Sequence, residues 1–186
     1  MRYRETSVLM EAGEIREALS RLAEDVLERL RGSARLALVG IRTRGVPLAR
    51  RLATRISSET GTEVPVGVLD ITLYRDDLTD IASQPVVRDT HLSFPVDGRR
   101  ILLVDDVLFT GRTVRAALDQ IIDFGRPERI ELLVLVDRGW RELPINADYV
   151  GREVQTSRRQ MVGVRLEEED GRDEVVLLEQ EPDTKP

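Results

Sequence analysis

Hydrophobic positions along this chain form two recurring patterns. Short apolar runs are typical of strands buried on both faces; they occur at residues 35–39, 66–74, 101–104 and 131–136. Longer segments with apolar residues three and four positions apart are typical of amphipathic helices; they occur at residues 11–31, 47–56 and 113–122. Because the two patterns alternate, the sequence predicts an α/β fold in which helices flank a central, mostly parallel sheet.

The remaining segments follow a less regular pattern. Residues 161–166 and 175–178 indicate two late strands, and Asp170 and Gly171 between them suit a hairpin turn. Residues 75–95 show no clear period, and a segment of that length is commonly functional. It is interpreted either as a loop that closes over a ligand or as a solvent-exposed hairpin.

Residues 101–113, ILLVDDVLFTGRT, carry the strongest chemical signal. The apolar run ends in Asp105 and Asp106, which should be solvated when no ligand is bound, and a Thr-Gly loop then opens a helix. Ligands of open α/β sheets bind at such strand ends. The N–H groups and the dipole at a helix start suit a phosphate, and two carboxylates suit ribose hydroxyls. The segment therefore predicts a ribose 5-phosphate site. The alternative is an ordinary helix start capped by Asp106 or Thr113.

A second loop, Gly40 to Gly45, also follows a predicted strand. Its glycines would allow the backbone to approach a ligand. Arg42 and Arg44 could meet a polyphosphate. Neither the Walker A phosphate motif nor a helix-opening G-x-G-x-x-G occurs in the chain.

Composition limits the possible chemistry. The 186 residues suit one domain with a substantial core. The absence of cysteine excludes disulfides and thiolate chemistry, and a single histidine, His91, excludes a multi-histidine zinc site. No apolar run approaches the roughly 20 residues of a membrane helix, and the first residues lack a signal-peptide core. We therefore expect a cytoplasmic protein without membrane contact.

The net charge of −6 is concentrated at one end of the chain. Residues 167–186 hold nine acids and two bases, so subtraction from the totals of 34 and 28 leaves 25 acids and 26 bases in residues 1–166. A nearly neutral body leaves room for a local arginine face that could bind nucleic acid. The alternative is a scattered set of solvated arginines.

The string VDDVLFTGRT resembles the phosphoribosyl-diphosphate (PRPP) signature of type I phosphoribosyltransferases. Together with DRGWRELPI at residues 137–145, it is most similar to one branch, the bacterial pyrimidine operon attenuation proteins that also act as uracil phosphoribosyltransferases. The resemblance extends from the first helix to about residue 160. It implies one domain over residues 1–186, with a hood over the base at about 138–165 and an acidic segment at 167–186.

The resemblance also assigns residues to roles. Asp105, Asp106 and Arg44 would be catalytic. The PRPP and UMP contacts would be Thr43, Arg44, Arg88, Asp105, Asp106, Val107, Leu108, Phe109, Thr110, Gly111, Arg112, Thr113, Asp137, Arg138 and Val162. RNA would contact Arg21, Arg141, Arg152, Arg158 and Arg159. Tyr74 and Arg75 are further candidate pyrophosphate contacts. Trp140 departs from the branch, where a histidine is expected; it could stack on a base or only pack.

The implied partners are PRPP, uracil, UMP or UTP, and the leader mRNA hairpin of a pyrimidine operon. Mg²⁺ would be held mainly through PRPP and water rather than by a protein cage. A homodimer or homotetramer is expected. The alternative function is a phosphoribosyltransferase without RNA regulation, acting on uracil or on another base such as a purine or orotate. The hood sequence favours uracil.

Overall fold

The computed structural model describes residues 3–30, 35–71 and 90–181. The described elements form two sheets and four helices. In chain order they are β1 Tyr3–Glu11, α1 Ala12–Leu30, β2 Leu36–Ile41, α2 Gly45–Thr60, β3 Val66–Leu69, β4 Arg100–Leu108, α3 Arg112–Asp123, β5 Arg129–Asp137, β6 Tyr149–Glu153, β7 Gln160–Arg165, α4 Glu167–Asp170 and β8 Glu174–Gln180.

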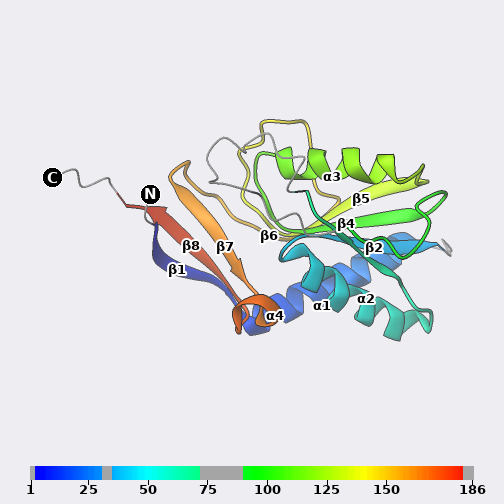
Figure 1. The fold of residues 1–186 in the computed structure, drawn as a ribbon. Coiled ribbons are helices and arrows are strands. Elements are labelled where there is room, and N and C mark those ends of the chain that lie inside the picture. The colour runs from blue at the N-terminus through cyan, green and yellow to red at the C-terminus, as the bar shows by residue number, and fades with distance from the viewer. Residues whose placement is uncertain (1–2, 31–34, 72–89, 182–186) are drawn as a thin grey trace.

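The larger sheet has five strands in the order β3-β2-β4-β5-β6, and all its pairings are parallel. Helix α3 covers one face, and α1 and α2 cover the other (Figure 1). Alternate residues of β4 enter the two cores, with Leu102 and Val104 on the α1–α2 side and Ile101 and Leu103 on the α3 side. Burial on both faces explains why the predicted strands have continuous apolar runs. The predicted fold class is confirmed.

Strand β4 is longer than predicted. The sequence indicated that it ends at Val104, but it continues through Asp105 and Asp106 to Leu108. Its pairing with β2 stops at Val104, whereas its pairing with β5 continues to Leu108. The two acids therefore lie on an overhang that is paired on one side only, and the side toward β2 is open for a site.

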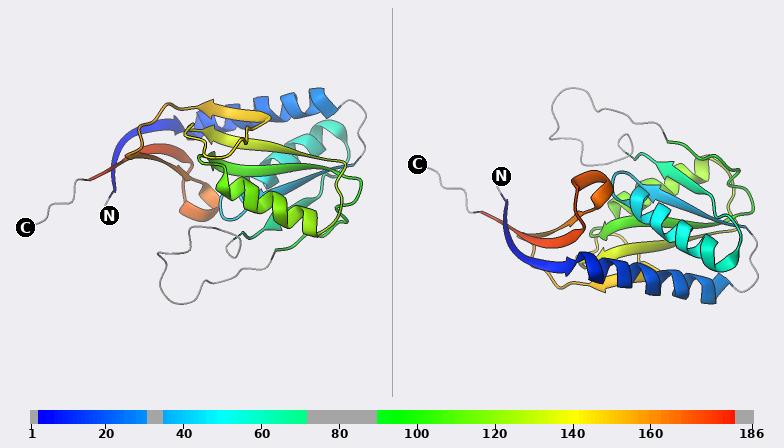
Figure 2. Two further views of the ribbon diagram at one scale, coloured as in Figure 1. Left: turned by 90° about the horizontal axis from the view of Figure 1, so that it is seen from above. Right: turned by 90° about the horizontal axis from the view of Figure 1, so that it is seen from below.

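The smaller sheet has three antiparallel strands in the order β1-β8-β7. It combines the first and last described strands, since Tyr3 pairs with Gln180 and Glu11 with Glu174. Figure 2 shows it beside the end of the larger sheet in both views. The sequence indicated β7 and β8, and they form the expected hairpin, closed by α4 and by Gly171 at φ 72°. It did not indicate β1 or β6.

The helices agree with their predicted positions, with two differences. Helix α2 begins at Gly45 and continues to Thr60, past the predicted end at residue 56. On α3 the predicted apolar face includes Val114, Ala117 and Ile121, which are buried, but Ile122 is 59% exposed. None of the helices formed by described residues is long and apolar enough to cross a membrane.

Candidate active site

A cavity of about 230 Å³ opens where β4 ends and α3 begins. The predicted PRPP and UMP contacts at residues 107–113, which include the predicted phosphate loop at 109–113, line it together with Asp105, Val114 and Glu142. Gly111 is the residue before the helix, at φ 91°, where other residues are strained. Gly111 has no side chain with which to cap the helix, so the start of α3 lacks the usual cap from that position. This arrangement suits a phosphate.

The two acids differ in environment. Asp105 is buried, at 5% exposure, whereas Asp106 is half-buried. Each acid accepts a hydrogen bond from the next backbone amide: Asp106 N–H donates to Asp105 Oδ1 and Val107 N–H to Asp106 Oδ1, both at 2.9 Å. These bonds fix the carboxylates at the edge of the sheet. The expectation that both acids are solvated is wrong for Asp105.

A second cavity, of about 300 Å³, lies on the β2 side of the acid pair. It shares Asp105, Val107 and Thr113 with the first cavity and also contains Asp106. Its other lining residues come from the ends of β2 and β3; they are Arg42, Thr43, Arg44, Asp70 and Ile71. The structure therefore brings the predicted pyrophosphate loop and the acid pair together around one cavity, which adjoins the first.

The glycines of the loop at residues 40–45 have a packing role within the protein. A Cβ at Gly45 would lie 2.3 Å from the carbonyl oxygen of Val104, and one at Gly40 would lie 2.6 Å from that of Gly45. Both glycines therefore allow close packing within the protein. The start of α2 is held against β4 in this way, which places Arg44 beside the acids.

Arg44 is held from outside its own loop. Its Nε donates to Asp170 Oδ2 at 3.0 Å and its Nη2 to Asp170 Oδ1 at 2.7 Å. Hydrogen bonding to Asp170 raises the pKa of Arg44, and the nearby charge of Asp106 raises it further. The guanidinium is therefore a fixed positive charge at the edge of the second cavity.

A third cavity, of about 530 Å³, lies at the carboxyl ends of β5 and β6. Asp137, Arg138, Trp140 and Arg141 line it. Arg138 is buried beneath the Phe109 ring, with 3.9 Å between its Cζ and the ring centroid. It donates to Gln160 O at 2.5 Å, and burial lowers its pKa. Arg138 thus connects the phosphate loop to the first residue of β7.

Backbone groups of Asp137 and Arg138 were predicted to read the base. In the structure Asp137 O accepts from Val154 N at 2.8 Å, and Arg138 N donates to Leu108 O at 3.1 Å. Each carbonyl oxygen retains a second lone pair for a ligand, whereas the Arg138 N–H is already used. Val162, the predicted apolar wall, is 7% exposed and lies in the core on the α1–α2 side.

Arg141 was predicted to contact RNA, but its guanidinium is directed into the protein. It forms an ion pair with Asp137 and donates to the carbonyl oxygens of Phe109 at 2.8 Å, Gly139 at 3.0 Å and Ile145 at 3.0 Å. Arg141 therefore connects the phosphate loop to the end of β5.

The other predicted RNA contacts are more exposed. Arg21 and Arg152 line one surface groove, where Arg21 Nη2 donates to Gly151 O at 2.7 Å and Arg152 Nη1 to Leu9 O at 2.5 Å. Arg158 lies 5.0 Å from the Trp140 ring centroid, and Arg159 is exposed. The Trp140 indole donates to Thr156 O at 2.6 Å. Arg88, Tyr74 and Arg75 lie outside the described residues.

Sequence reasoning missed several residues of the site. Asp70 was placed inside a strand predicted to run to residue 74, but β3 ends at Leu69. Its position directly after a strand was the available signal. Glu142 lines the first cavity, and its carboxylate accepts from Arg112 Nε at 2.8 Å. Asp170 reaches the site from the β7–β8 connection, and nothing in its local sequence indicated this contact.

Comparison with known proteins agrees with the resemblance to phosphoribosyltransferases that the sequence indicates. Residues 9–169 match the family described as "Phosphoribosyl transferase domain". The "Bifunctional protein PyrR" of Pelotomaculum thermopropionicum is 60% identical over 95% of this chain and 97% of its own. The protein of that name from Thermus thermophilus is 61% identical over 93% and 96%.

The fold resembles solved phosphoribosyltransferases. The hypoxanthine phosphoribosyltransferase of Trypanosoma cruzi superposes with a TM-score of 0.73 at 18% identity, over 95% of this chain and 98% of that one. A hypoxanthine-guanine phosphoribosyltransferase of Bacillus anthracis gives 0.70 at 15% identity, over 93% and 98%. At these identities the likeness concerns the fold.

Proposed function

Because this chain belongs to the phosphoribosyltransferase family, and within it to the bifunctional PyrR proteins, we infer that it is both a uracil phosphoribosyltransferase and an RNA-binding attenuator of pyrimidine biosynthesis genes. The relatives match it over nearly their whole length at 60% and 61% identity. This agrees with the function expected from residues 101–113 and 137–145. A phosphoribosyltransferase without a regulatory role is the less favoured alternative.

The observation that carries the enzymatic proposal is that the first two cavities adjoin at the acid pair, where they share Asp105, Val107 and Thr113. We assign the 5-phosphate to the loop of residues 109–113 at the start of α3. Asp105 and Asp106 would hold the ribose hydroxyls. Thr43 and Arg44 would hold the diphosphate in the second cavity. In this arrangement the sugar carbon that reacts lies near the carboxylates.

The reaction requires placement and electrostatic stabilisation rather than a protein nucleophile. A uracil nitrogen bonds to C1 of the ribose and loses its proton, while the C1–oxygen bond breaks and its electron pair leaves with the diphosphate. The carboxylates of Asp105 and Asp106 would stabilise positive charge that develops on the sugar ring. Arg44 would offset negative charge on the departing diphosphate.

Mg²⁺ fits this site as a companion of PRPP. Among the described residues no group of three or more His, Cys, Asp or Glu side chains is arranged to hold a metal. Asp70 and Asp106 do line the second cavity, and Mg²⁺ typically binds one or two carboxylates together with substrate phosphates and water. When bound, the ion would neutralise charge on the diphosphate.

The test of the enzymatic proposal is product formation from PRPP and Mg²⁺ with uracil, hypoxanthine, guanine or orotate. We expect uracil to react fastest. Asp106→Asn should reduce turnover by about 100-fold or more, since loss of one group that stabilises transition-state charge commonly costs a few kcal/mol. Faster reaction with another base would overturn the assignment of uracil. Normal turnover of Asp106→Asn would overturn the role of that acid.

For the regulatory function we propose that leader RNA binds an arginine face that includes Arg21 and Arg152. The two side chains line the same groove on α1 and β6, which Glu14 and Glu17 also line. The body of the protein is nearly neutral outside residues 167–186. Arg158, stacked on Trp140, would extend the contact toward the third cavity. Nucleotide in the active site could then influence RNA affinity through the segment that follows β5.

A further inference from the structure

Two arginines of the α2 region connect the larger sheet to the β7–β8 hairpin. Arg44, directly before the helix, and Arg51 are seven residues apart, so they lie two turns apart on one face. Arg51 pairs with Glu168 at 2.6 Å and with Asp173 at 2.7 Å. Arg44 pairs with Asp170 at 2.7 Å. The three acids thus belong to one short segment around α4, and each is an ion-pair partner of the α2 region.

Only one of these arginines faces the site. Arg44 lines the second cavity together with Asp105 and Asp106, whereas Arg51 does not line it. Both arginines therefore pair with carboxylates of the segment around α4, but only Arg44 lies at the proposed substrate site.

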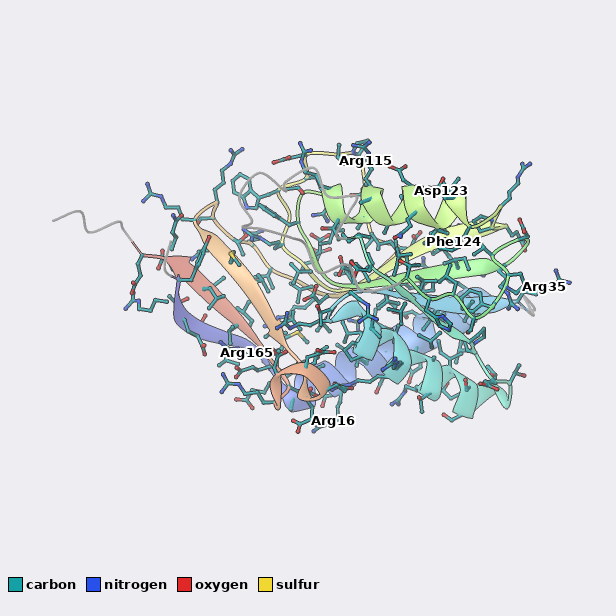
Figure 3. The ribbon with its side chains drawn as sticks, in the orientation of Figure 1. Arg16, Arg35, Arg115, Asp123, Phe124 and Arg165 are labelled. Carbon is teal, nitrogen blue, oxygen red and sulfur yellow. The ribbon has the colours of Figure 1, made fainter. Side chains whose placement is uncertain are left out.

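Asp170 is itself held in a fixed orientation. Its Oδ2 accepts the backbone N–H of Leu166 at 2.9 Å, in addition to the bond from Arg44. Its side chain is 21% exposed, and hydrogen bonding to Arg44 lowers its pKa, so it stays ionised near neutral pH. In Figure 3 Arg165 and Arg16 lie at the same end of the molecule as α4. Arg165 also lowers the pKa of Asp170, and Arg16 that of Asp173.

The pair uses only part of the Arg44 guanidinium. Asp170 accepts from Nε and Nη2, and among the described residues Nη1 has no hydrogen-bond partner. A guanidinium carries five N–H donors in one plane. The Nε–Nη2 edge is therefore occupied by the protein, and the adjacent Nη1–Nη2 edge remains for a second anion. A bidentate carboxylate fixes the plane, so the free edge has a defined direction before substrate arrives.

We propose that Asp170 is a positioning residue for the phosphoribosyl transfer. It orients Arg44 so that the free edge of the guanidinium meets the diphosphate of PRPP. The inference rests on the proposed role of Arg44 as a diphosphate contact. The side-chain freedom of Arg44 is already restricted in the folded protein, so less is lost when PRPP binds. The β7–β8 hairpin thus contributes to the affinity for PRPP without touching it.

The test compares Asp170→Asn with the matched variant Asp173→Asn. Both remove one carboxylate from an ion pair between the α2 region and the same hairpin. We expect Asp170→Asn to raise the KM for PRPP about tenfold, with little change in the KM for uracil and in the affinity for UMP, which lacks the diphosphate. Asp173→Asn should change neither KM. Asp170→Glu, which retains a carboxylate, should recover most of the affinity for PRPP.

A double-mutant cycle identifies Arg44 as the intermediary. Arg44→Gln should raise the KM for PRPP more than Asp170→Asn does, and the double variant should match Arg44→Gln alone, because Asp170 would act only through Arg44. Additive effects would overturn the proposal. It also fails if Asp170→Asn binds PRPP normally, or if Asp173→Asn weakens PRPP equally, which would indicate loosened hairpin docking. Failure of the wild-type protein to form UMP from PRPP would instead overturn the proposed function and this inference together.

Discussion

At the scale of single residues, Asp105 and Asp106 are neighbours in sequence but lie in different environments. Asp105 is buried and accepts the amide of Asp106, whereas Asp106 is half-buried at the second cavity. The sequence predicted both acids correctly as residues at the edge of the sheet, but it could not separate them. Consecutive side chains of a strand face opposite sides of the sheet, so the difference depends on what packs against each side of β4, which is a property of the three-dimensional structure.

Arg141 shows how a surface prediction changes when the partners of a side chain are known. Its guanidinium contacts Asp137 and the carbonyl oxygens of Phe109, Gly139 and Ile145. Arg141→Ala should therefore lower uracil turnover at least tenfold, because the phosphate loop loses the hydrogen bond from Arg141 to Phe109 O that helps to connect it to the end of β5. It should also destabilise the fold by about 1–3 kcal/mol, the cost of leaving buried polar groups unpaired.

The matched control is Arg158→Ala, since Arg158 stacks on exposed Trp140 rather than bonding to the loop. Steady-state turnover and thermal unfolding of both variants are the measurements. If Arg141→Ala keeps wild-type turnover and stability, Arg141 does not support the loop, and a direct role in RNA binding becomes the better interpretation.

At the scale of elements, α2 is joined to the β7–β8 hairpin by ion pairs that respond to pH. Hydrogen bonding to Arg51 lowers the pKa of Glu168 and of Asp173, and bonding to Arg44 lowers that of Asp170. A carboxylate with a lowered folded-state pKa stabilises the fold above its unfolded-state pKa, about 4, and that contribution is lost as pH falls through the lower folded-state value.

We therefore expect the free energy of unfolding to fall more steeply below about pH 4 in the wild type than in a Glu168→Gln/Asp173→Asn variant. The difference at neutral pH should be about 1 kcal/mol, because partly exposed ion pairs are screened by solvent. Chemical denaturation from pH 7 to pH 3 measures both. Parallel pH profiles for the two proteins would show that these pairs do not contribute.

The elements that sequence could predict were those with their own hydrophobic pattern. Helix α1 and strands β4 and β5 bury continuous or periodic apolar residues, and their positions were correct to within a few residues. Strand β1 buries only Met10 among its residues, so its sequence has no apolar face. It is a strand because β8 pairs with it, and that partner is distant in the chain.

At the scale of the whole molecule, the candidate RNA face combines residues distant in sequence. Arg21 and Arg152 line the same groove because α1 packs against β6. The affinity for a pyrimidine-leader hairpin should fall as salt rises, since phosphate contacts release counterions. Arg21→Ala should weaken binding and spare uracil turnover, and UMP should strengthen binding of the wild-type protein.

The control variant is Arg126→Ala, an exposed arginine before β5 at the opposite end of the sheet. Binding is measured by mobility shift at several salt concentrations, with and without UMP. Equal affinity for unrelated RNA would show that the face does not select the leader. If UMP leaves the affinity for RNA unchanged, RNA binding is not coupled to the nucleotide site.

How the site comes together was only partly predictable. Parallel strands place their carboxyl ends at one edge, so the sequence could predict that residues 40–45, 105–113 and 137–138 converge. It could not predict that Asp170 reaches Arg44, because that contact depends on how the small sheet sits against α2. Strand periodicity indicates which side of the sheet a side chain faces, but not which element packs against that side.

The pairing of β1 with β8 has a consequence for biosynthesis. Ribosomes deliver the chain from its first residue, and parallel strands of the larger sheet can associate while later residues are still being made. The smaller sheet cannot, because its first strand must wait for the last described one, Glu174–Gln180. Closing so long a loop is slow relative to local folding. A nascent chain stalled before residue 174 would have the loop of residues 109–113 but an unpartnered first strand, so full activity would arise only after Glu174–Gln180 has been made.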